Sequence, residues 1–145
     1  MRGEVIVAAW RALAKLIEPE PTWKAADRMA GYTTTSETSD GEWWTREYRE
    51  RDVDGMRVGR WVVGPRQHDF EALADALIPH RVRFSSVDKR LPVGEECDWL
   101  ACAVHDDPTG TRIHLVTEAR HPILSDAAAV AAARVLGLIP GEPTP

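Results

Sequence analysis

The stretch CDWLACAVHDDPTGTRIHLVTEAR, residues 97–120, decides the fold predicted for this chain. Two runs of strand-forming residues flank Asp107-Pro108-Thr109-Gly110, where proline presets the turn and glycine tolerates a positive φ. A turn at these four residues places Val104 opposite Ile113 and Ala103 opposite His114. In that register the apolar residues share one face of an antiparallel hairpin: Leu100, Cys102, Val104, Ile113, Leu115 and Thr117.

A second hairpin is predicted over residues 43–63, around the dipeptide Asp54-Gly55. This dipeptide is typical of a two-residue type I′ turn, in which both central residues have a positive φ. Such a turn pairs Val53 with Met56 and Tyr48 with Trp61. One face of the hairpin then carries Trp44, Tyr48, Trp61 and Val63.

Helices are predicted from apolar periodicity and capping residues at 3–18, 23–30, 70–78 and 126–136. One more strand is predicted at 81–87, and residues 32–40 fit either an edge strand or a mobile loop. The order is α-α-β-β-(β)-α-β-β-β-α, which indicates an α+β fold. We expect a single domain over residues 1–140, with one antiparallel or mixed sheet of about five to six strands covered by helices. Residues 141–145 are expected to be a disordered tail.

The composition is that of an ordinary globular protein, with 145 residues, 43% hydrophobic and 28% charged. No secretory signal and no apolar run of membrane-spanning length is found, so we expect a cytoplasmic protein without membrane contact. Cys97 and Cys102 fall on opposite faces of one predicted strand and cannot bridge, which favours a reducing compartment. Abundant arginine and alanine favour a bacterial or phage genome.

The aromatic residues of the second hairpin are the leading candidates for a functional surface. At least one face of so aromatic a hairpin must be buried, either under helices or against another chain. Tryptophan, tyrosine and arginine are typical anchors of protein interfaces. We therefore expect a non-enzymatic protein-binding module, such as a homodimer, adaptor, inhibitor or small structural component that binds itself or another protein. The predicted interface comprises Trp43, Trp44, Tyr48, Arg49 and Trp61.

Two alternatives remain open from the sequence. In the predicted register His105 and His114 lie diagonally on one face, where they could share a metal ion and support a small hydrolase. The arginines of residues 46–66 could instead bind single-stranded nucleic acid, although neighbouring acidic residues offset them and the net charge is −5. No phosphate-binding loop or nucleophile motif occurs. We therefore expect no cofactor and favour protein binding.

Overall fold

The computed structural model describes residues 3–21, 32–90, 98–106 and 115–140. The chain divides into two compact units, which are described separately. Unit 1 comprises residues 1–13 and 67–145, and unit 2 comprises residues 14–66. Helix α1 (Gly3–Ile17) contributes residues to both units. The predicted helix at 23–30 and the tail at 141–145 lie outside the described residues, and the single domain over 1–140 stays a prediction.

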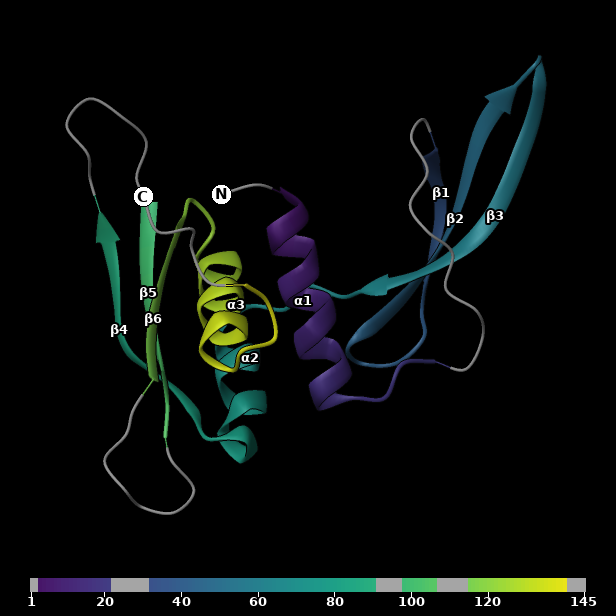
Figure 1. The fold of residues 1–145 in the computed structure, drawn as a ribbon. Coiled ribbons are helices and arrows are strands. Elements are labelled where there is room, and N and C mark those ends of the chain that lie inside the picture. Colours follow the sequence, from purple (N-terminus) through teal and green to yellow (C-terminus); the bar gives the residue numbers. More distant parts are fainter. Residues whose placement is uncertain (1–2, 22–31, 91–97, 107–114, 141–145) are drawn as a thin grey trace. The chain divides into compact units, whose positions relative to one another are not determined.

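Unit 2 contains a three-stranded antiparallel sheet in the order β1-β2-β3 (Figure 1). Its strands are β1 (Thr33–Ser39), β2 (Trp44–Val53) and β3 (Met56–Pro65). The register pairs Val53 with Met56 and Tyr48 with Trp61, as predicted. Asp54 and Gly55 have φ values of 52° and 80°, which confirms the type I′ turn. Strand β1 shows that the segment at 32–40 forms an edge strand.

Unit 1 contains the second sheet, in the order β4-β5-β6, with helices α2 and α3 on one face (Figure 1). The strands are β4 (Val82–Arg90), β5 (Asp98–His105) and β6 (Leu115–His121). Helix α2 (Phe70–Leu77) leads through a short 3-10 helix, Ile78–His80, into β4. Asp69 caps α2 by accepting a hydrogen bond from the Ala72 amide at 2.8 Å.

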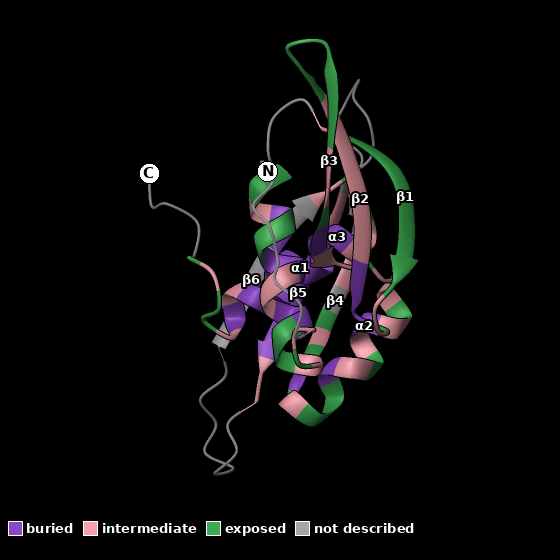
Figure 2. Ribbon diagram, turned by 90° about the vertical axis from the view of Figure 1, so that its right-hand side faces the viewer, coloured by how far each residue is buried: buried purple, intermediate pink, exposed green. Residues whose placement is uncertain are grey.

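Helix α3 (Leu124–Val135) is largely buried in unit 1 (Figure 2). Its alanines have no exposed surface, and the same is true of Ala101 and Ala103 on β5. Alanine on both surfaces allows a helix to pack closely on a sheet. The long alanine run of this sequence is therefore explained by the packing of α3 against β5 and β6.

The predicted register of the β5–β6 hairpin is wrong. Val104 pairs with Val116, three positions beyond the predicted partner, and Ala103 pairs with Thr117. The predicted grouping of apolar residues on one face therefore does not hold. The observed register places Ala101 opposite Ala119, and both are buried. Packing of small residues under α3 accounts for this register. The predicted turn at residues 107–110 lies outside the described residues.

The α+β class is confirmed, but the single sheet of five to six strands is not. The described strands form two antiparallel sheets of three strands each. The change of sheet occurs where Pro65 ends β3 and α2 follows, so that β4 starts a new meander. Among the described helices, none has both the length and the apolar character needed to cross a membrane.

Candidate protein-interaction surface on the first hairpin

The β2–β3 hairpin brings aromatic and basic side chains together on one face of its sheet. Tyr48 and Trp61 lie directly opposite each other, with ring centroids 5.2 Å apart and planes tilted by 53°. The guanidinium carbon of Arg46 lies 4.5 Å from the Trp61 ring centroid. These are favourable aromatic and cation–π geometries. The face therefore presents a preformed aromatic group that holds one cation.

Gly59 is required by the position of the Tyr48 ring. A Cβ atom at position 59 would lie 2.1 Å from the Tyr48 hydroxyl oxygen and 2.4 Å from the ring carbon that carries it. No side chain fits in that space. The Tyr48 ring can lie across β3 only because residue 59 is a glycine.

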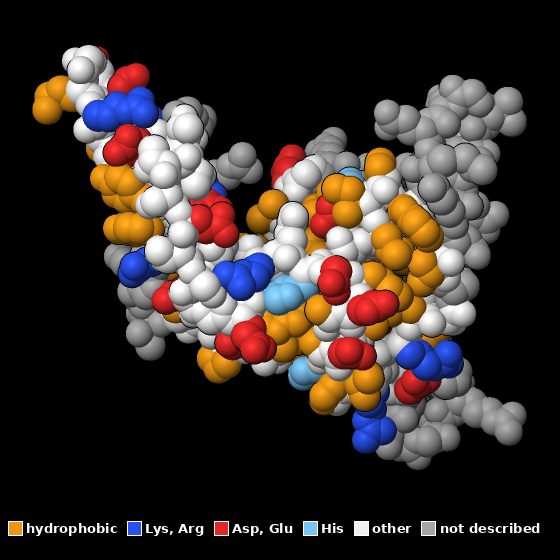
Figure 3. Space-filling view, turned by 180° about the vertical axis from the view of Figure 1, so that it is seen from behind, with side chains coloured by type: hydrophobic (Ala, Val, Ile, Leu, Met, Phe, Trp, Pro, Cys, Tyr) orange, Lys and Arg blue, Asp and Glu red, His pale blue; other side chains and the backbone are white. Residues whose placement is uncertain are grey.

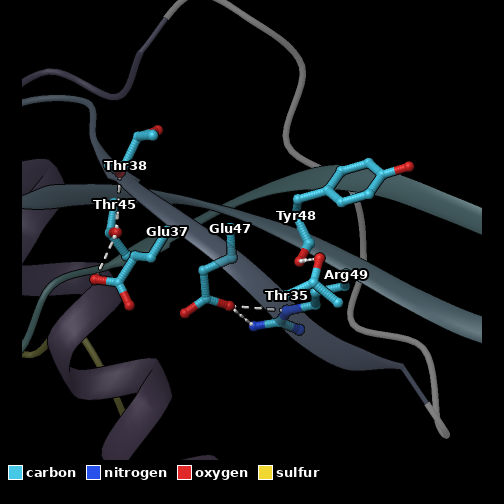
Figure 4. Close-up of polar contacts among 7 residues, drawn as sticks. All are labelled: Thr35, Glu37, Thr38, Thr45, Glu47, Tyr48 and Arg49. Atoms are coloured by element: carbon cyan, nitrogen blue, oxygen red, sulfur yellow. Dashed lines mark hydrogen bonds and ion pairs between the residues drawn. The ribbon is translucent and has the colours of Figure 1, made fainter.

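Polar contacts join β1 to β2 and fix the side chains between them (Figure 4). The Thr45 hydroxyl lies 3.2 Å from both the Glu37 carboxylate and the Thr38 carbonyl oxygen. The Thr35 hydroxyl donates to the Tyr48 carbonyl at 3.2 Å. These contacts tie the otherwise exposed strand β1 to the central strand of the sheet.

Carboxylates of the same sheet pair with several of its arginines. Arg49 Nε donates to Glu47 at 2.8 Å, and a second guanidinium nitrogen binds the same oxygen (Figure 4). Arg57 lies 3.3 Å from Glu50 and 3.4 Å from Asp52. Opposite charges at this range offset the positive field of the hairpin, so the cation-rich sequence does not produce an unopposed basic surface.

The five residues of the predicted interface lie in different surroundings. Trp43 and Trp44 are buried, with 6% and 0% of their surfaces exposed. Both are held by Glu18: its carboxylate accepts from the Trp43 amide at 2.8 Å, and its carbonyl accepts from Trp44 Nε1 at 3.2 Å. Tyr48 and Arg49 are half-buried, and Trp61 is 37% exposed. Of the three tryptophans, only Trp61 therefore offers substantial surface to a partner.

Sequence reasoning missed the apolar residues at the turn end of the same hairpin. Val53, Met56 and Val58 are 36%, 71% and 42% exposed. These three residues share one face of the hairpin, whereas Trp61 lies on the opposite face beside Tyr48. We call these four exposed residues, on the two faces of one hairpin, the hairpin patch. Figure 3 shows hydrophobic side chains along the hairpin, interleaved with acidic and basic ones. The sequence pattern placed these residues on the predicted strands, but only the structure shows that they are exposed.

Of the two histidines of the predicted metal site, the structure describes only His105, so the metal site stays a prediction. His105 is half-buried at the end of β5 and pairs with Leu115, whereas His114 lies outside the described residues. Because Ala103 pairs with Thr117, the predicted placement of His114 opposite Ala103 is wrong. Within residues 3–21, 32–90, 98–106 and 115–140, no three His, Cys, Asp or Glu residues are placed to hold a metal ion.

No protein-family model, curated protein or solved structure matches this chain. Its function is therefore inferred from the chemistry of the hairpin.

Proposed function

We propose that this chain is a non-enzymatic protein-binding module that binds its partner through the hairpin patch, with Tyr48 and Arg46 beside Trp61 on one face and Val53, Met56 and Val58 on the other. One observation carries the proposal. Four of the nine large hydrophobic residues that are exposed in the described chain belong to this one hairpin: Val53, Met56, Val58 and Trp61.

Clustering distinguishes these residues from ordinary surface hydrophobic residues. Single exposed apolar side chains are common on globular proteins, whereas grouped ones are typical of interaction sites. The other exposed members of the set are spread over α1, the 3-10 helix and the two ends of α3. On the hairpin, Val53, Met56 and Val58 lie together on one face, and Trp61 lies on the opposite face with a cation above its ring. Aromatic residues, methionine and arginine are enriched at protein interfaces.

Native mass spectrometry of the full chain, purified with its co-expressed host proteins, tests the proposal. We expect the wild-type chain to retain a protein partner, either another protein or a second copy. Trp61→Ala and Met56→Ser should lose that partner while remaining folded, because both side chains are exposed.

Ile78→Ser is the matched control, since Ile78 is 67% exposed but lies in the 3-10 helix of unit 1. It should retain the partner. If the complex survives both hairpin substitutions, or is lost equally in the control, the hairpin patch is not the binding surface.

A further inference from the structure

Among the residues that the structure describes, the outer edge of β3 has backbone hydrogen-bonding groups without a backbone partner. Val53 and Met56 flank a two-residue turn and therefore form a hydrogen-bonded pair. Pairs alternate along an antiparallel ladder, so Arg57, Gly59 and Trp61 direct their amide and carbonyl groups away from β2. Strand β3 ends the sheet order, and within the described part of the chain no backbone hydrogen bond reaches these three residues.

The two edges of this sheet differ in the regularity of their ladders. Strand β1 contains a register shift between Thr34 and Ser36, and such a bulge hinders the addition of another strand. Strand β3 keeps an unbroken register with β2 from Met56 to Pro65. It is therefore the regular edge of this sheet, and it carries the exposed residues Met56, Val58 and Trp61.

The sequence of this edge is complementary to itself. Around Gly59, the segment Arg57-Val58-Gly59-Arg60-Trp61 places a cation and an apolar residue at matching distances on either side. We infer that β3 pairs antiparallel with β3 of a second copy, across a two-fold axis at Gly59, to form one six-stranded sheet. This inference rests on the proposed function of the hairpin and names its partner.

The axis at Gly59 gives the best pairing of side chains. Arg57 then lies opposite Trp61 of the second copy, a favourable pair of cation and aromatic ring. Val58 lies opposite Arg60 of the second copy, whose aliphatic stem can cover it. An axis at Arg60 would place Arg60 opposite Arg60 of the second copy, and two like charges at that distance repel. An axis at Val58 would place Trp61 opposite Gly55 in the turn and shorten the ladder.

Disulfide trapping tests this register. Val58→Cys and Arg60→Cys are made separately in full-length chains in which Cys97→Ser and Cys102→Ala remove the native thiols. The axis at Gly59 makes positions 58 and 60 a non-hydrogen-bonded pair across the interface, with Cα atoms about 4.5 Å apart, which suits a disulfide. We expect a covalent dimer when the two variants are mixed and little from either alone. Absence of that dimer, or equal trapping by Val58→Cys alone, overturns the register.

Introducing a positive or a negative charge at position 58 tests the pairing in solution, measured by sedimentation velocity over a range of concentrations. Val58→Lys would place two like-charged pairs across the two-fold axis, so the dimer dissociation constant should rise about tenfold. Val58→Glu should leave it unchanged or lower it, because glutamate then faces Arg60 of the second copy. Val58 also pairs with Arg51 in its own hairpin. Thermal unfolding of each variant therefore confirms that it is folded at the temperature used.

The outcomes separate this inference from the proposed function. A monomer at all concentrations that still captures a different protein through Trp61 overturns self-pairing and leaves the binding role intact. A dimer weakened equally by Val58→Lys and Val58→Glu overturns the strand pairing at Gly59, since it indicates an apolar contact between the two copies in place of that register. A dimer that is insensitive to Trp61→Ala, Met56→Ser and Val58→Lys overturns both proposals.

Discussion

Trp44 and Trp61 occupy the same face of the β2–β3 hairpin and differ in what surrounds them. Trp44 has no exposed surface and donates to the Glu18 carbonyl, whereas Trp61 is 37% exposed. We expect Trp44→Ala to lower the free energy of unfolding by about 3–5 kcal/mol, because it removes a buried aromatic side chain and leaves a cavity. Trp61→Ala should cost about 1 kcal/mol or less. Urea denaturation of both variants checks this; equal losses would contradict the assignment of Trp44 to the core.

A buried carboxylate in unit 1 provides a second prediction at the scale of single residues. Asp126 is 4% exposed, and its Oδ1 atom accepts a hydrogen bond from Trp10 Nε1 at 2.8 Å. Its other oxygen lies 3.9 Å from Nδ1 of His121. We expect Trp10→Phe to lower the free energy of unfolding by about 1–3 kcal/mol, because an acceptor buried in the protein loses its donor.

A double-mutant cycle separates the hydrogen bond from the loss of ring volume. Asp126→Ala is combined with Trp10→Phe, and the coupling free energy is taken from chemical denaturation of the four proteins. A coupling near zero would mean that the contact between Trp10 and Asp126 contributes nothing beyond packing. The two residues are 116 positions apart, so neither helix pattern contained any sign of this pair.

At the scale of the element, the β2–β3 hairpin depends on two glycines for different reasons. Gly55 has a φ of 80°, and Gly59 leaves room for the Tyr48 ring. We expect Gly59→Ala to destabilise the protein by about 1–3 kcal/mol through overpacking. Gly55→Ala should cost about 1 kcal/mol, since alanine is disfavoured at positive φ. Thermal unfolding measures both effects.

The close approach of Gly59 and Tyr48 is tested by making Gly59→Ala in a protein that already carries Tyr48→Ala. In a Tyr48→Ala protein the obstructing ring is gone, and Gly59→Ala should then be nearly neutral. Gly55→Ala should keep its cost there, because its strain is in the backbone of the turn. A cost at position 59 that persists without the tyrosine would refute the proposed close approach.

Helix α3 provides the corresponding prediction for unit 1. Its alanines have no exposed surface, and Ala101 and Ala103 of β5 are equally buried. We expect Ala131→Leu to destabilise the protein by about 1–3 kcal/mol, because added methylenes have no space between the helix and its neighbours. Leu138→Ala, at a residue 40% exposed beyond the helix, is the control and should change stability little. A stable Ala131→Leu variant, measured by urea denaturation, would show that α3 lies less closely packed than described.

At the scale of the whole molecule, the six strands in the described part of the chain divide into two sheets of three. Residues 14–66 form one unit and residues 1–13 and 67–145 the other, and α1 supplies residues to both. We expect one cooperative unfolding transition, because a single helix shared by both units links their stabilities. Tryptophan fluorescence and far-ultraviolet circular dichroism should give the same midpoint. Two separated midpoints would contradict the prediction of one domain over residues 1–140.

The candidate site was predictable only in part, for reasons of burial. The strand pattern identified the aromatic hairpin and paired Tyr48 with Trp61 correctly. It could not distinguish the buried Trp43 and Trp44 from the exposed Trp61, because alternation assigns a face without saying what covers it. Val53, Met56 and Val58 were missed for the same reason.

The sequence by itself determined the β2–β3 hairpin, including its register. Asp54-Gly55 closes a turn of two residues, so the geometry of neighbouring residues specifies every pair that follows. Only the tertiary structure decided the β5–β6 register and the division into two sheets. Val104 pairs with Val116, and Ala101 and Ala119 lie buried in the sheet against which α3 packs. That choice depends on packing between segments far apart in the chain, which no local turn signal encodes.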